Sequence, residues 1–134
     1  MPLRRALVAL LAAAFTFGLT VGSAGATAVP TYTQRNSGSV VKVKQGTIFK
    51  VSLRTAADGG YAWSLTHGRH SRDFALVSRR VISPEGVVGG YAQTVFTLRA
   101  THAGTDYISA VERRSFERNS TIARFKLTIT VGKR

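Results

Sequence analysis

The sequence contains no cysteine, three prolines, one tryptophan and only six acidic residues. Without cysteine no disulfide can support the fold and no lipid-modified cysteine can tether the chain to a membrane, so stability must come from packing alone. The six Asp and Glu stand against nineteen Lys and Arg, which gives a formal net charge of +13. A positive field of this size favours acidic partners and speeds their encounter with the protein.

The few carboxylates give little sign of catalysis. No close pair suggests general acid–base chemistry, and no glycine-rich phosphate motif opens a helix. The six are scattered along the chain: Asp58, Asp73, Glu85, Asp106, Glu112 and Glu117.

One short segment does contain the residue types of metal sites and hydrolases. His67, His70 and Asp73 lie three apart, with Ser71 between them. Two His and a carboxylate could bind a metal, and Ser, His and Asp together could hydrolyse an ester or amide. However, two neighbouring arginines would repel a cation, and no nucleophile motif flanks Ser71. We expect a solvated loop, with no metal, no cofactor and no enzymatic activity, and we keep a small hydrolase only as the weakest alternative.

Residues 1–28 have the order of a secretory signal peptide. Arg4 and Arg5 precede an uncharged apolar run over 6–21, and small residues follow in 23–28. A membrane anchor is the competing interpretation, because the length of the apolar run does not exclude it. The small residues favour cleavage after Ala26 or Ala28. Cleavage after Ala28 leaves 134 − 28 = 106 residues with a net charge of 13 − 2 = +11. We therefore predict a secreted protein of the extracellular space or cell envelope.

The remaining chain reads as one all-β domain. Residues 29–39 are polar and contain proline, so we expect a loose lead-in to a domain over 40–134. Beyond the apolar run, no segment has a helical period. Alternation of apolar and polar residues predicts strands at 40–44, 47–54, 61–65, 74–81, 93–100, 105–111 and 123–131. About seven short strands separated by regular turns predict an antiparallel β-sandwich.

The sequence is organised around the stretch 55–65. Gly59 and Gly60 can adopt backbone angles that are closed to other residues. Directly after them, Tyr61, Trp63 and Leu65 alternate with small residues, which indicates a strand with one buried face. The simplest interpretation is a β-hairpin or inter-sheet loop that has no function beyond turning the chain.

Three loops taken together resemble the chagasin-type inhibitors of papain-like cysteine peptidases. Ala56-Ala57-Asp58-Gly59-Gly60-Tyr61-Ala62-Trp63 stands where that family has an Asn-Pro-Thr-Thr-Gly loop followed by an aromatic, a small residue and Trp. Val88-Gly89-Gly90-Tyr91-Ala92 falls near its Gly-x-Gly-Gly loop, and Arg114-Ser115-Phe116 falls on its Arg-Pro-Trp loop. The resemblance spans about Val40 to Val131. Of the first motif only the final Gly is kept, and Ser115 and Phe116 replace Pro and Trp of the third.

The resemblance implies an immunoglobulin-like sandwich that blocks the active-site cleft of a papain-like cysteine peptidase with three loops. The peptidase-binding residues that it implies are Ala57, Asp58, Gly59, Gly60, Gly89, Gly90, Arg114 and Phe116. Trp63 is expected in the core and not at the contact. The alternative is a secreted immunoglobulin-like surface-binding module that keeps the fold but has lost inhibitory activity.

The basic residues suggest two further kinds of partner. Arg113, Arg114 and Arg118 lie close to Phe116, and basic residues interleaved with aromatics can bind single-stranded nucleic acid. Because the charges are spread over many segments, we expect no specific nucleic-acid binding. We expect nonspecific adsorption to an anionic cell surface instead, and a monomeric protein.

Overall fold

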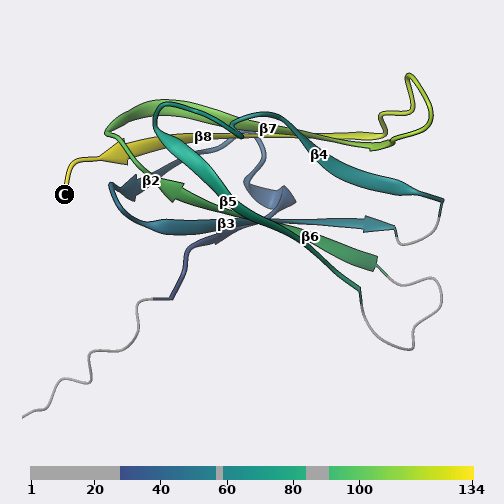
Figure 1. The fold of residues 1–134 in the computed structure, drawn as a ribbon, viewed down its shortest axis with the longest axis horizontal. Coiled ribbons are helices and arrows are strands. Elements are labelled where there is room, and N and C mark those ends of the chain that lie inside the picture. The colour runs from purple at the N-terminus through teal and green to yellow at the C-terminus, as the bar shows by residue number, and fades with distance from the viewer. Residues whose placement is uncertain (1–27, 57–58, 84–90) are drawn as a thin grey trace, which may run out of the picture.

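The computed structural model describes residues 28–56, 59–83 and 91–134, which form two packed β-sheets (Figure 1). One sheet has the strand order β1-β3-β6-β5 and the other has the order β2-β8-β7-β4. The all-β sandwich predicted from the sequence is confirmed. The elements are β1 (Thr31–Tyr32), a 3-10 helix η1 (Gln34–Asn36), β2 (Val40–Lys44), β3 (Ile48–Ala56), β4 (Tyr61–His67), β5 (Phe74–Ile82), β6 (Tyr91–Ala100), β7 (Gly104–Arg114) and β8 (Ala123–Gly132).

Two of the strand pairs are parallel, which the sequence did not predict. β1 pairs with β3 and β2 pairs with β8 in parallel, whereas the other pairs are antiparallel. Alternation reports which face of a strand is buried but carries no information about the direction of its neighbour. The segment expected to be a loose lead-in contains β1 and η1, and the ring of Tyr32 packs edge-on against Phe49 with centroids 6.3 Å apart.

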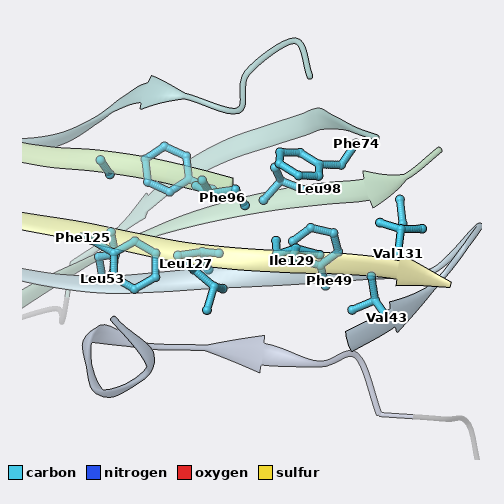
Figure 2. Packing of buried hydrophobic residues seen from close by; sticks show 14 of the residues in the cluster. Val43, Phe49, Leu53, Phe74, Phe96, Leu98, Phe125, Leu127, Ile129 and Val131 are labelled. Atoms are coloured by element: carbon cyan, nitrogen blue, oxygen red, sulfur yellow. The ribbon is translucent and has the colours of Figure 1, made fainter. Parts of the chain in front are cut away.

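The core lies between the two sheets and is almost entirely aliphatic and aromatic (Figure 2). Each strand that crosses the centre contributes alternate residues, as in β8, where Phe125, Leu127 and Ile129 are buried and the residues between them face outward. Burial of each such side chain is worth about 1.5–3 kcal/mol. The core residues are Val43, Phe49, Val51, Leu53, Trp63, Phe74, Phe96, Leu98, Ala100, Ile108, Ala110, Phe125, Leu127, Ile129 and Val131.

Polar links join the two sheets at one end of this core. Trp63 is 1% exposed, as expected for a core residue, and its Nε1 donates a hydrogen bond of 3.0 Å to the carbonyl oxygen of Arg54 on β3. Thr55 Oγ1 donates 2.6 Å to Oε1 of the buried Glu112. The strand predicted at 105–111 is therefore longer than expected, because β7 continues to Arg114 and buries Glu112. In the described part of the chain, no helix is long and apolar enough to cross a membrane.

Candidate functional site

Strand pairing places three connections at the same end of the sandwich. Ala56 at the end of β3 pairs with Tyr91 at the start of β6, and Tyr61 at the start of β4 pairs with Arg114 at the end of β7. The connection from β3 to β4, the connection from β5 to β6 and the connection from β7 to β8 therefore all leave from this end, the right-hand end in Figure 1. We call it the loop end.

The first of these connections closes with a turn that only glycine adopts without strain. Gly59 and Gly60 have φ of +87° and +75°, in the left-handed region. Arg114 Nε donates a hydrogen bond of 2.7 Å to the carbonyl oxygen of Gly59. The guanidinium carbon of Arg114 also lies 4.6 Å from the centre of the Tyr61 ring. Arg114 thus joins the first connection to the third by a charge-assisted hydrogen bond and a cation–π contact.

Phe116 lies directly over Gly60. A Cβ atom added at Gly60 would stand 3.0 Å from Phe116 Cε1, closer than an ordinary van der Waals contact. The Phe116 side chain is nevertheless 72% exposed. The glycine therefore lets the ring approach the backbone on one side while the rest of the ring faces solvent. Aromatic side chains, Phe among them, are enriched in protein–protein interfaces, so an aromatic displayed in this way is a candidate binding anchor.

The third connection is held in shape by its own polar contacts. Ser120 Oγ accepts 3.0 Å from the backbone N–H of Arg114 and lies within 3.1 Å of the carbonyl oxygens of Arg114 and Glu117. Arg114 Nη1 forms an ion pair of 3.1 Å with Glu117 Oε1. Asn119 adopts a φ of +62°, which asparagine tolerates better than most residues. These contacts order Arg114 and its neighbours before any partner arrives.

The structure brings together four of the eight predicted contact residues. Gly59, Gly60, Arg114 and Phe116 form one contiguous cluster. Ala57, Asp58, Gly89 and Gly90 lie outside the described residues. The strands that border them meet at the loop end through the Ala56–Tyr91 pair.

Sequence reasoning missed several members of this end. Tyr61 was assigned only to the buried face of β4, yet it is half-buried and its ring contacts the Arg114 guanidinium. Glu117 was treated only as a scattered acid, although its position three residues after Arg114 is a spacing at which ion pairs form. Tyr91 is exposed, and its ring lies 4.3 Å from the Arg54 guanidinium carbon. A basic residue paired with an aromatic across two strands is a signal that the sequence alone does not make visible.

The segment at residues 67–73 does not form a hydrolase site. Asp106 is its central acceptor: Ser71 Oγ donates to Asp106 Oδ2, and His67 Nε2 lies 3.1 Å from Asp106 Oδ1. In a catalytic triad the histidine stands between the serine and the carboxylate, whereas here the carboxylate stands between the serine and the histidine. Partial burial raises the pKa of Asp106, but hydrogen bonds from Ser71, the backbone of Tyr107 and His67 outweigh it and hold the pKa below its usual value. The cluster is a structural link between this segment and β7.

A metal site is likewise unsupported in the described residues. Across 28–56, 59–83 and 91–134, no group of three or more His, Asp or Glu side chains is placed to hold a metal ion. Of the predicted trio, His67 is engaged with Asp106, and Asp73 is buried beside Gly104.

The sandwich and the contacts between Arg114, Phe116 and the glycine turn define a class of protein: an immunoglobulin-like scaffold that presents adjacent loops. Residues 42–131 match the sequence profile of the Chagasin family peptidase inhibitor I42. The match covers more than half of the chain, and the chain therefore belongs to this inhibitor family and not to a family of enzymes. No curated protein sequence matches it significantly.

Solved structures of other proteins share the fold, among them a cysteine protease inhibitor. The inhibitor EhICP2 from Entamoeba histolytica superposes with a TM-score of 0.67 at 19% identity, over 78% of this chain and 96% of that one. Amebosin superposes with a TM-score of 0.65 at 18% identity, over 78% and 99%. PbICP-C, solved in complex with falcipain-2, gives 0.55 at 16% identity, over 79% and 91%. These similarities establish the fold.

Proposed function

We propose that this protein is an exported inhibitor of papain-like cysteine peptidases and that it blocks their active-site cleft with the three connections at the loop end. The observation that carries the proposal is the Arg114–Gly59 hydrogen bond together with the packing of Phe116 on Gly60. These contacts fix two connections against each other in the free protein. Family membership and the PbICP-C complex with falcipain-2 supply the class of partner.

Preorganisation explains how such an end would bind tightly. Association of two proteins costs free energy for every side chain and loop that becomes ordered. At the loop end Arg114, Glu117 and Ser120 already hold the third connection, and Gly59 is already bonded to Arg114. These residues need little further ordering on binding, so a larger part of their contact energy goes into affinity.

The chemistry of the target suggests a role for each connection. A papain-like enzyme has a cleft with a thiolate paired to a cationic His. The glycine turn at Gly59 and Gly60 would bring backbone close to this centre without presenting a scissile bond in the right place. The connection after β5 would pair with backbone along the cleft, as an added strand does. Phe116 would fill an apolar site on the wall of the cleft.

Export is the second part of the proposal and rests on the sequence. The order of basic residues, apolar run and small residues in 1–28 supports secretion. A protein released in this way would meet peptidases outside the cytoplasm. Mass spectrometry of the protein recovered from the medium of expressing cells tests this, and we expect an N-terminus at Thr27 or Val29; an intact leader in the cell membrane would contradict it.

The direct test of inhibition is titration of the protein into papain, with the hydrolysis of a small fluorogenic peptide as readout. We expect stoichiometric or near-stoichiometric loss of activity. Phe116→Ala should raise the inhibition constant about 30-fold or more, because truncating a central aromatic anchor costs about 2 kcal/mol or more. Val40→Ala is the matched control, since Val40 is also exposed but lies on β2.

The outcome separates the inhibitor from the surface-binding module. Full papain activity at high micromolar protein, with a normally folded sample, would contradict inhibition and favour the module. Equal inhibition by Phe116→Ala and Val40→Ala would leave inhibition in place but remove Phe116 from the contact.

A further inference from the structure

The outer face of the β2-β8-β7-β4 sheet carries positive charge and no carboxylate. Its exposed cations are Lys42, Lys44, Arg113, Arg124 and Lys126. The only acidic residues on these four strands, Asp106 and Glu112, occupy the inward positions of β7, where Glu112 is buried and Asp106 is bonded to Ser71 and His67. All four strands lie within the described residues. We call this surface the β2–β8 face.

Four of these cations follow one line along the seam between β2 and β8. In the register of the two parallel strands, Lys42 stands beside Thr130 and Lys44 beside Gly132. Both lysines therefore lie closer to the C-terminal end of β8 than Arg124 and Lys126 do. Eight residue steps separate the levels of Arg124 and Lys44, which is about 26 Å at about 3.3 Å per residue. Within each pair of cations the spacing is about 6.6 Å.

One hydroxyl group, of Thr128, lies in the gap between the two pairs, and another, of Thr130, lies beside Lys42. Thr128 and Thr130 alternate with buried residues on β8, so they share the outer face with Lys126. Thr130 Oγ1 lies 3.3 Å from Thr105 Oγ1 on β7. Hydroxyls donate hydrogen bonds to anionic oxygens without adding charge of either sign. On β2 the exposed Val40 stands beside Thr128, so the hydrogen-bond donors between the two pairs of cations come from β8.

The face provides little for stacking bases. Among the Phe, Tyr and Trp residues of the four strands, only Tyr107 points outward. Its ring is already engaged, because it stacks on His67 with centroids 4.0 Å apart and Lys126 Nζ lies 4.6 Å from its centre. Proteins that bind single-stranded nucleic acid combine a basic track with aromatic rings on which bases stack. The β2–β8 face has the track but not the free rings.

We propose that the β2–β8 face is a binding site for an extended polyanion that repeats a phosphodiester group without bases, such as a poly(glycerol phosphate) polymer of a cell surface. The chain of phosphates would lie along the seam, with Arg124 and Lys126 at one end and Lys42 and Lys44 at the other. Because Phe116 and the Gly59–Gly60 turn lie in the connections at the strand ends, the bound polymer would leave the loop end free. This site is independent of the proposed peptidase inhibition.

The test compares two variants that each lose three positive charges from opposite faces of the sandwich. Lys42→Gln, Lys44→Gln and Lys126→Gln together remove three of the four positive charges along the seam. Lys50→Gln, Arg80→Gln and Arg99→Gln together remove the same charge from the outer face of the β1-β3-β6-β5 sheet, where these cations lie on three different strands. Thermal unfolding of both variants checks that they are folded.

Binding of poly(glycerol phosphate) is measured by calorimetry over a range of salt concentrations. At about 0.1 M salt the seam variant should bind about 100-fold more weakly than the wild type, and its salt slope should fall by about 2, because each lost contact removes about 0.7 from the slope. The opposite-face variant should lose tenfold or less. Equal losses in the two variants would show adsorption driven by net charge and overturn the proposal.

Two other polyanions identify the ligand. Oligothymidylate of the same number of phosphates should bind more weakly than poly(glycerol phosphate), and phosphatidylglycerol vesicles should not discriminate between the two variants. Tighter binding of oligothymidylate would assign the face to nucleic acid, and a selective loss of vesicle binding in the seam variant would assign it to membranes; either result overturns the proposal. Papain inhibition by the seam variant should equal that of the wild type, so loss of one activity is distinguishable from loss of the other.

Discussion

Replacing Gly60 by alanine tests whether the turn and Phe116 act as one unit. The residue has a φ of +75°, where an L side chain costs about 1–2 kcal/mol. Alanine also lowers the conformational entropy of the unfolded chain, which stabilises the folded state by about 0.4–1 kcal/mol. From the middle of each range, the net loss of stability should be about 0.8 kcal/mol, or roughly 3–6 °C in the melting temperature of a domain of this size. In addition, the new methyl group would stand 3.0 Å from Phe116 Cε1 and push the ring aside.

Gly38→Ala is the matched control for this substitution. Gly38 has a φ of +83°, and a Cβ atom there would meet nothing within 4 Å. Both variants should melt at similar temperatures, because Phe116 is mostly exposed and its displacement costs the fold little. Papain inhibition should weaken about 30-fold or more in Gly60→Ala alone, as loss of an aromatic anchor does. Equal inhibition constants for the two variants would refute the coupling between the turn and Phe116.

Two further predictions concern stability. Because the pKa of Asp106 is lowered, its contribution to stability is present above pH of about 4 and is lost as the pH falls further, through its folded-state pKa. The urea midpoint should therefore drop more steeply between about pH 5 and pH 2 in the wild type than in Asp106→Asn, and parallel profiles would contradict this. Trp63→Phe removes buried volume and the hydrogen bond to Arg54, so the free energy of unfolding should fall by about 1–3 kcal/mol. Urea unfolding followed by circular dichroism measures it, and a loss below about 0.5 kcal/mol would contradict the role given to this side chain.

The strands were predictable because each buries one face. In β8, five apolar residues alternate with polar ones, and the structure buries four of those five, from Phe125 to Val131, and half-buries Ala123. The strand around Trp63 was found in the same way. What alternation could not give was pairing: β1 has only two residues, and the parallel neighbours of β3 and β8 are chosen by tertiary packing.

The candidate site was predictable in outline but not in its contacts. The resemblance placed the first and third loops in order along the chain, and strand pairing brings Gly59 and Gly60 next to Arg114 and Phe116. The sequence alone did not reveal that Arg114 bonds to Gly59 and pairs with Glu117. Arg114 was expected to contact the peptidase, whereas its geometry in the free protein indicates that it also positions the turn. Such a contact depends on side-chain direction across two strands, which spacing does not encode.

The most direct test of the central claim is hydrogen–deuterium exchange of the protein, free and bound to papain. Binding through the loop end should slow exchange at Gly59, Gly60 and the residues from Arg114 to Glu117, while the turn at 101–104, at the other end of β7, keeps its rate. Protection at 101–104 with none at the glycine turn would place the peptidase at the opposite end of the sandwich and contradict the account.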